Sequence, residues 1–122
     1  MAKIVLVDDM KVMRLYMRKA LERARFTVDE WEPPAATEIA DRLDASKPDL
    51  VVTDYMMPGC NGATIARLTR RTHPMLPVLV VTSLRDEEVN RTLMKQGATD
   101  VIYKPVSPED LVGKVKHLLH QS

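Results

Sequence analysis

Short apolar runs recur along the chain, and the stretches between them return apolar residues every three or four positions. Runs of four or five residues rich in Val, Ile and Leu predict strands. Their lack of alternation is typical of strands buried on both faces of a parallel sheet. A weaker run, TVDEW, carries two acids in the middle. The predicted strands cover residues 3–7, 27–31, 49–53, 78–81 and 100–103.

The stretches between the strands predict helices. Pro33-Pro34 is expected to open a helix that Lys47-Pro48 ends. Asp86 is a good N-cap and Gly97 a good C′ residue for a later helix, and Ser107-Pro108 is a good start for the last one. The first helix, over residues 10–24, and the second are expected to face inward through Met13, Tyr16, Met17, Ala20, Leu21 and Ala24, and through Ile39, Ala40 and Leu43.

This strand–helix alternation predicts one α/β domain over residues 1–122, with a doubly wound parallel sheet. The net charge of +1 gives no reason to expect direct binding to nucleic acid or to an anionic membrane. Cys60 is the single cysteine, so a disulfide framework is excluded and a reducing, cytoplasmic compartment is expected. The longest apolar run is far too short to span a bilayer.

Charged and polar residues follow the ends of several apolar runs. Asp8-Asp9, Asp54, Thr82 and Lys104 each come at the end of a predicted strand, and Met57-Pro58-Gly59 turns the chain after Asp54. Open parallel sheets bind ligands outside the carboxyl ends of their strands. At about 4 Å and an effective dielectric constant near 20, each carboxylate pair there would repel by roughly 4 kcal/mol. A divalent cation relieves this repulsion, and oxygen ligands favour Mg²⁺ or Mn²⁺. The pattern therefore predicts a phosphoryl site with a metal.

Over its whole length the chain resembles the receiver domain of bacterial response regulators, in particular the single-domain chemotaxis type. The resemblance rests on the acidic pair Asp8-Asp9, the lone Asp54, Thr82 and Lys104-Pro105, each after the appropriate strand. It implies a flavodoxin-like (βα)5 fold with the strand order 2-1-3-4-5. It also implies a phosphoacceptor signalling domain rather than an enzyme with a separate substrate.

The resemblance also implies a role for each site residue. Asp54 would accept the phosphoryl group. Asp9 would bind Mg²⁺ directly, Asp8 would act through water, and Met56 would offer its backbone carbonyl. Thr82 would supply the switch hydroxyl, and Lys104 would be the lysine of the site.

The phosphoryl donor is expected to be a phosphohistidine of a partner histidine kinase or phosphotransfer protein. The chain has neither GxxxxGK[ST] nor GxGxxG, so it lacks a loop that would cradle a nucleotide. The downstream target is not identified by the sequence. In this family the output face comprises the fourth helix, fifth strand and fifth helix, and either a monomer or a phosphorylation-dependent dimer is compatible with it.

Two departures from the family pattern carry expectations of their own. Val101 occupies the position, three residues before the lysine, where the family commonly has Tyr or Phe, while Tyr103 lies on the same strand face. Met56 and Leu84 are bulky and apolar where family side chains flank the phosphoryl group. We expect them to hinder water and to lengthen the life of the aspartyl phosphate. The resemblance further implies a cis Lys104-Pro105 bond.

One side of the first helix is expected to be exposed and basic. In the family this side meets the kinase, and Leu15 is its one apolar member. The alternative is an ordinary solvated helix face. The stripe comprises Lys11, Arg14, Leu15, Arg18 and Arg25.

Several alternatives remain open at this point. Gln121-Ser122 would end a stand-alone response regulator with no following DNA-binding domain, but a receiver cut from a longer transcription factor or hybrid kinase has the same pattern. A small Mg²⁺-dependent phosphohydrolase would typically show Asp-x-Asp and a cap domain. A flavodoxin-like cofactor binder would need a Ser/Thr-rich phosphate loop. A phosphate-independent interaction module would not need the complete acidic site.

Overall fold

The computed structural model describes residues 1–120 and contains one parallel five-stranded sheet in the order β2-β1-β3-β4-β5. The predicted doubly wound fold and strand order are confirmed. Gln121 and Ser122, on which the expectation of no following domain depended, lie outside the described residues. The strands are β1 Lys3–Val7, β2 Thr27–Trp31, β3 Leu50–Asp54, β4 Val78–Thr82 and β5 Asp100–Tyr103. The helices are α1 Lys11–Arg23, α2 Ile39–Ser46, α3 Gly62–Thr72, α4 Glu87–Gln96 and α5 Pro108–Leu119, with a 3₁₀ turn, η1, at Ala36–Glu38.

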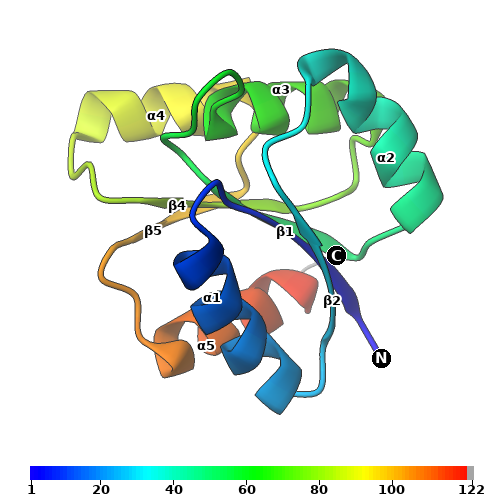
Figure 1. Cartoon of the computed structure of the whole chain (residues 1–122). Coiled ribbons are helices and arrows are strands. Elements are labelled where there is room, and N and C mark those ends of the chain that lie inside the picture. Colours follow the sequence, from blue (N-terminus) through cyan, green and yellow to red (C-terminus); the bar gives the residue numbers. More distant parts are fainter. Residues whose placement is uncertain (121–122) are drawn as a thin grey trace.

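Helices cover both faces of the sheet (Figure 1). Helices α2, α3 and α4 lie on one face, and α1 and α5 lie on the other. Right-handed crossovers between parallel strands produce this arrangement when the strand order reverses near the middle of the sheet. No helix within residues 1–120 combines the length and apolarity that a bilayer span requires.

Two hydrophobic cores form because alternate residues of each strand point to opposite faces. In β1, Val5 and Val7 pack in the core under α2–α4, whereas Ile4 and Leu6 pack in the core with α1 and α5. All residues of β3 and β4 are buried, while β5 at the edge is only half-buried. The middle strands therefore give the sheet's carboxyl edge a rigid support.

The predicted caps of the last two helices are confirmed. The Asp86 side chain accepts hydrogen bonds from the N–H groups of Glu88 and Val89, and Gly97 ends α4 with a φ of 135°. The Ser107 side chain accepts from the Asp110 N–H at the start of α5. These local signals need no tertiary contact, which is why the sequence located them correctly.

The structure differs from the sequence predictions in several details. Strand β3 includes Asp54, because Asp54 pairs in register with Val81 of β4. Pro33-Pro34 does not open α2: Ala35 is extended, with φ −66° and ψ 145°, and its N–H donates to the Glu38 carboxylate at 2.9 Å, so helical structure begins after it. Tyr16, predicted to face inward, is 40% exposed and donates its hydroxyl to the Val106 carbonyl.

Candidate functional site

Backbone hydrogen bonds continue the sheet past the ends of three strands. The Asp8 N–H donates to the Trp31 carbonyl at 3.3 Å, the Tyr55 N–H to the Val81 carbonyl at 2.9 Å, and the Lys104 N–H to the Thr82 carbonyl at 2.9 Å. The first residues after β1, β3 and β5 are thus held in the plane of the sheet. The side chains of Asp8, Asp54 and Lys104 meet at this edge, as the sequence predicted.

Three carboxylates converge at this edge. Oxygens of Asp8, Asp9 and Asp54 lie within 4.8 Å of one another. Asp8 is fully buried and Asp54 is 5% exposed, whereas Asp9 lies at the surface. The cluster thus combines two buried acids with one that solvent reaches.

The Asp8 carboxylate is only partly satisfied by protein groups. Its Oδ1 accepts the Met10 N–H at 2.9 Å, whereas its buried Oδ2 has no hydrogen-bond partner. Burial raises the pKa of this carboxyl; the Met10 N–H opposes the rise, and the negative charge of Asp54 adds to it. An unpaired buried oxygen is costly, so a cation ligated there would relieve both the burial and the repulsion.

Asp54 already faces a cation of the chain. The Lys104 Nζ lies 3.0 Å from Asp54 Oδ1, and the same oxygen accepts the Tyr55 N–H at 3.0 Å. The Lys104-Pro105 peptide bond is cis, as the resemblance implied. The ammonium partly offsets the negative charge of the acidic cluster and keeps the Asp54 side chain at the edge.

Thr82 is the last residue of β4 and is 1% exposed. Its Oγ1 accepts the Leu84 N–H at 3.0 Å, which ties the first residues of the β4–α4 loop to the strand. Leu84 is 40% exposed and Met56, in the β3–α3 loop, is 66% exposed. Two apolar side chains therefore lie at the surface on the loops that leave β3 and β4.

The donor set fits Mg²⁺ or Mn²⁺ rather than zinc. The converging groups are three carboxylates, with neither His nor Cys among them. Hard oxygen ligands of this kind suit Mg²⁺ and Mn²⁺. The buried Asp8 Oδ2, which has no hydrogen-bond partner, independently points to a cation.

Arg14 is the one residue of the expected exposed stripe that the structure buries. It is 7% exposed, whereas Lys11, Leu15 and Arg18 are exposed. The expectation was wrong for Arg14 because the acids at the end of β2 draw its guanidinium under the helix. Glu30, one of the two acids inside the run TVDEW, was the available signal. Arg25 lies past the end of α1, with a φ of 71°.

Gly62, which the sequence showed only as part of a turn, packs against the backbone of the strand that carries Asp54. A Cβ at this position would lie 2.6 Å from the Asp54 carbonyl oxygen, and the Gly62 N–H donates to the Tyr55 carbonyl at 2.8 Å. Asn61 caps α3 by accepting the Thr64 N–H at 2.9 Å. Only glycine lets α3 start this close to the strand that carries Asp54.

Tyr103 connects β5 to α4 and to the loop before it. Its hydroxyl bonds to the Asn90 side-chain amide, and the Arg85 guanidinium lies 4.7 Å from the centre of its ring. Val101 is half-buried and packs against the core under α2–α4. The aromatic residue on this strand face is therefore Tyr103, in contact with the segment that follows Thr82.

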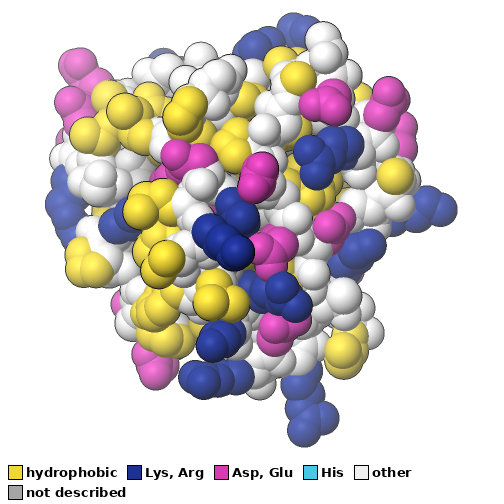
Figure 2. Space-filling view, viewed as in Figure 1, with side chains coloured by type: hydrophobic (Ala, Val, Ile, Leu, Met, Phe, Trp, Pro, Cys, Tyr) yellow, Lys and Arg dark blue, Asp and Glu magenta, His cyan; other side chains and the backbone are white. Residues whose placement is uncertain are grey.

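Acidic and basic side chains are interspersed over the visible face of the molecule (Figure 2). This distribution agrees with the net charge of +1. A stripe of a single sign, which DNA-binding surfaces need, does not occupy this face. Three acidic side chains are instead clustered at the carboxyl edge of the sheet.

Comparison with known proteins gives one consistent result. The family model for the response regulator receiver domain matches residues 4–116. The chain is 37% identical over 121 residues to the transcriptional regulatory protein ResD of Bacillus subtilis, covering 98% of this chain and 49% of ResD. It is 34% identical over 123 residues to the phosphate regulon transcriptional regulatory protein PhoB of Pseudomonas aeruginosa, covering 98% and 52%.

Solved structures show the same fold. The signal receiver domain of the response regulator NarL from Mycobacterium tuberculosis superposes with a TM-score of 0.88 at 23% identity, over 99% of this chain and 98% of that one. The chain spans about half the length of ResD and PhoB. The activities of those longer proteins are therefore not transferred to it.

Proposed function

The chain belongs to the response regulator receiver domain family of two-component systems, and we propose that its Asp54 accepts a phosphoryl group from a histidine of a partner kinase. The observation that carries the proposal is the acidic cluster of Asp8, Asp9 and Asp54, in which Asp54 lies beside Lys104 and the buried Asp8 keeps an unpaired oxygen. Within residues 1–120, no other aspartate belongs to a group of three carboxylates that could hold a metal ion.

In the proposed reaction, an oxygen of the Asp54 carboxylate forms a bond to phosphorus while the P–N bond of the phosphohistidine breaks. The electron pair of that bond stays on the imidazole nitrogen, and the product is an acyl phosphate. Asp8, Asp9 and the Met56 backbone carbonyl would hold Mg²⁺ together with Asp54. Bound Mg²⁺ would offset the negative charge of the phosphoryl group.

Lys104 and Thr82 supply the remaining contacts. The Lys104 ammonium, now 3.0 Å from Asp54, can pair with a phosphoryl oxygen without leaving the site. Thr82 Oγ1 accepts the Leu84 N–H, so its own O–H remains available as a donor to another phosphoryl oxygen. Positioning and charge stabilisation of this kind supply most of the catalysis in phosphoryl transfer.

Movement of Thr82 toward the phosphoryl group is the proposed switch. The Leu84 N–H is bonded to Thr82, and Arg85, the next residue, lies over the Tyr103 ring. A shift of Thr82 would therefore be transmitted to Tyr103 and, through Asn90, to α4. The α4–β5–α5 face is the proposed surface for a downstream partner or a second phosphorylated copy.

The decisive experiment is intact-mass measurement after incubation with acetyl phosphate, with Mg²⁺ or with EDTA, on wild type and Asp54→Asn. Wild type should gain the mass of one phosphoryl group, and this gain should require both Mg²⁺ and Asp54. A folded wild type that gains no mass contradicts the proposal and would favour a phosphate-independent module. Continuous release of phosphate from p-nitrophenyl phosphate would instead favour a phosphohydrolase.

The exposed side of α1 is the proposed kinase contact. Leu15 is 47% exposed among the exposed Lys11 and Arg18, so an apolar contact there would be framed by positive charge. Leu15→Asp should slow transfer from a cognate kinase while leaving phosphorylation by acetyl phosphate unchanged. Equal transfer rates for wild type and variant would remove this face from the proposal.

A further inference from the structure

Arg14 is a charged side chain that is nevertheless buried. It is the only buried Lys or Arg within residues 1–120, at 7% exposure. Removing a guanidinium from water is unfavourable unless its N–H groups find acceptors. The partners of Arg14 therefore indicate what its burial achieves.

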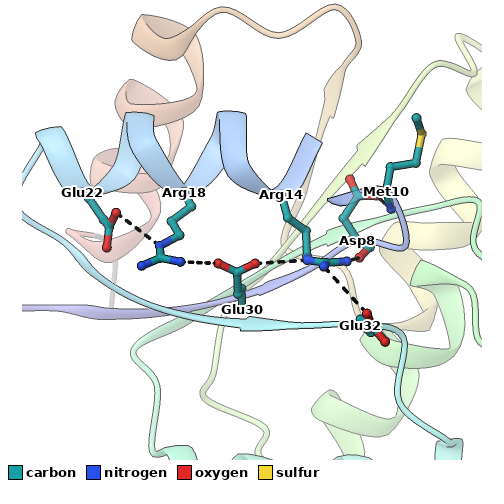
Figure 3. Close-up of polar contacts among 7 residues, drawn as sticks. All are labelled: Asp8, Met10, Arg14, Arg18, Glu22, Glu30 and Glu32. Carbon is teal, nitrogen blue, oxygen red and sulfur yellow. Dashed lines mark hydrogen bonds and ion pairs between the residues drawn. The ribbon is translucent and has the colours of Figure 1, made fainter. Parts of the chain in front are cut away.

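The guanidinium spans two segments of the chain (Figure 3). Its Nη1 donates to the Asp8 carbonyl oxygen at 2.7 Å, and its Nε donates to Glu30 Oε1 at 3.2 Å. Glu32 Oε1 lies 3.9 Å from Nη2, but Glu32 is largely exposed and adds little. The strong contacts are thus one backbone carbonyl in the acidic site and one carboxylate of β2.

Glu30 is itself held in place. Its second oxygen, Oε2, accepts Arg18 Nη1 at 2.7 Å, and Arg18 Nε lies 3.3 Å from Glu22. The hydrogen bond from Arg18 lowers the pKa of the Glu30 carboxyl, and that from Arg14 lowers it too, so Glu30 is ionised at neutral pH. The ion pairs from Glu22 through Arg18 to Glu30 therefore orient the Arg14 guanidinium toward the Asp8 carbonyl.

The Asp8 carbonyl belongs to the peptide unit that joins Asp8 to Asp9. Its orientation sets the directions in which both side chains leave the backbone. The N–H on the other side of Asp8 donates to the Trp31 carbonyl, so the Asp8 backbone is fixed from both sides. Asp8 Oδ1 and the Met10 N–H close the turn that follows.

We propose that Arg14 is a positioning residue, whose bond to the Asp8 carbonyl fixes the Asp8–Asp9 peptide and so holds both carboxylates in the arrangement that binds Mg²⁺. This inference rests on the metal-dependent function proposed above. Groups that orient metal ligands typically contribute a factor of about 10–100 to metal affinity.

A role of Arg14 through its charge and a role through positioning predict opposite effects of its removal on Mg²⁺ affinity. Arg14→Met removes a positive charge near three carboxylates, and by Coulomb's law alone that change should tighten Mg²⁺ binding. Loss of the bond to Asp8 should weaken it. The direction of the change therefore separates the two roles, which a loss of activity alone would not do.

The test is calorimetric titration of the full chain with Mg²⁺. Arg14→Met should raise the Kd about tenfold or more. Arg14→Lys keeps the charge but lacks the planar fork, so it should fall between wild type and Arg14→Met. Arg23→Met is the matched control, because it removes the same charge from an exposed position further along α1 and should leave the Kd within a factor of about two.

Folding is controlled separately. Arg14→Met leaves Glu30 with Arg18 as its remaining close partner. The double variant Arg14→Met/Glu30→Gln also removes the Glu30 charge, while the Asp8 carbonyl still lacks its donor. It should bind Mg²⁺ as weakly as the single variant, with a native circular dichroism spectrum. A lower melting temperature with an unchanged or tighter Kd would overturn the positioning role. A wild type that binds no Mg²⁺ would overturn the proposed function and this role with it.

Discussion

On the β1–β2 side of the acidic edge, α1 buries four side chains, whereas on the β4–β5 side α4 buries only Leu93. The first side fixes the Asp8 backbone through Arg14, and Glu30 fixes Arg14. On the second side, Thr82 contacts its own loop, and β5 is half-buried throughout. The groups proposed to hold Mg²⁺ are thus firmly anchored, while the groups proposed to respond lie where few buried contacts oppose movement.

Such an unequal distribution suits a switch. Segments with few buried apolar contacts open at lower free energy than the rest of a domain. A new charge at Asp54 needs a rigid set of ligands on one side and a displaceable element on the other. The following predictions test this difference between the two sides, from the largest expected effect to the smallest.

Truncation of the single buried side chain of α4 should release that helix. Leu93→Ala should lower the free energy of unfolding by about 2–5 kcal/mol and speed hydrogen exchange of α4 amides more than those of α1. Leu21→Ala, at a fully buried position of α1, should cost a similar amount without favouring either helix. Uniform loss of protection in Leu93→Ala would show that α4 is as firmly held as α1.

Gly62 supports the strand that carries Asp54 between the two sides. Gly62→Ala places a Cβ 2.6 Å from the Asp54 carbonyl oxygen and should destabilise the domain by about 1–3 kcal/mol in urea unfolding. Gly113→Ala is the matched control, since a Cβ there meets no atom within 4 Å. In the interior of α5 it should stabilise by about 0.5–1 kcal/mol. The prediction is wrong if both variants shift stability in the same direction.

The aspartyl phosphate should be long-lived because Met56 and Leu84 hinder water on the responsive side. Met56→Asn with Leu84→Glu should speed loss of the phosphoryl group about tenfold, equivalent to roughly 1.4 kcal/mol in the barrier. The measurement is decay of the phosphorylated mass after removal of acetyl phosphate. Met75→Asn is the control, because Met75 is an exposed methionine in the α3–β4 connection, away from the acidic edge. An unchanged decay rate in the double variant would exclude hindrance by these side chains.

Glu30 on the anchored side should make stability depend on pH. Its pKa is lowered in the folded state, mainly by Arg18, so its contribution is present above the ordinary glutamate pKa and is lost as the pH falls through the folded value. Glu30→Gln should therefore destabilise the domain at neutral pH by about 1 kcal/mol or less, and the difference from wild type should shrink in acid. A difference that stays constant across this range, measured by urea unfolding, would mean that the charge of Glu30 does not matter.

Much of the fold could be read from the sequence because its signals are local. Short apolar runs located the strands, although the run of β2 is interrupted by two acids, and Asp86, Gly97 and Ser107 marked helix ends through contacts within one turn. The exit of Asp8, Asp54 and Lys104 from the carboxyl ends of parallel strands placed them at one edge. Such inferences need only the period of the chain and the topology of a parallel sheet.

The failures lie where a residue's neighbours come from distant parts of the chain. Arg14 sits on a helix face that local periodicity marks as exposed, and its burial depends on Glu30 of β2. Gly62 looks like an ordinary turn glycine until α3 is packed against the Asp54 carbonyl. Tyr16 follows the inward spacing of α1 yet lies at the margin of its buried face, bonded to Val106.

The sequence by itself determined the fold class, the strand order through its family resemblance, and which acids and which lysine could share a site. Only the tertiary structure decided that Asp8 is buried with one oxygen unpaired, while Asp9 stays exposed. It also decided that Arg14 turns inward to fix their shared peptide. The physical reason is that burial and pairing are properties of contacts between segments, and no periodic pattern within one segment encodes them.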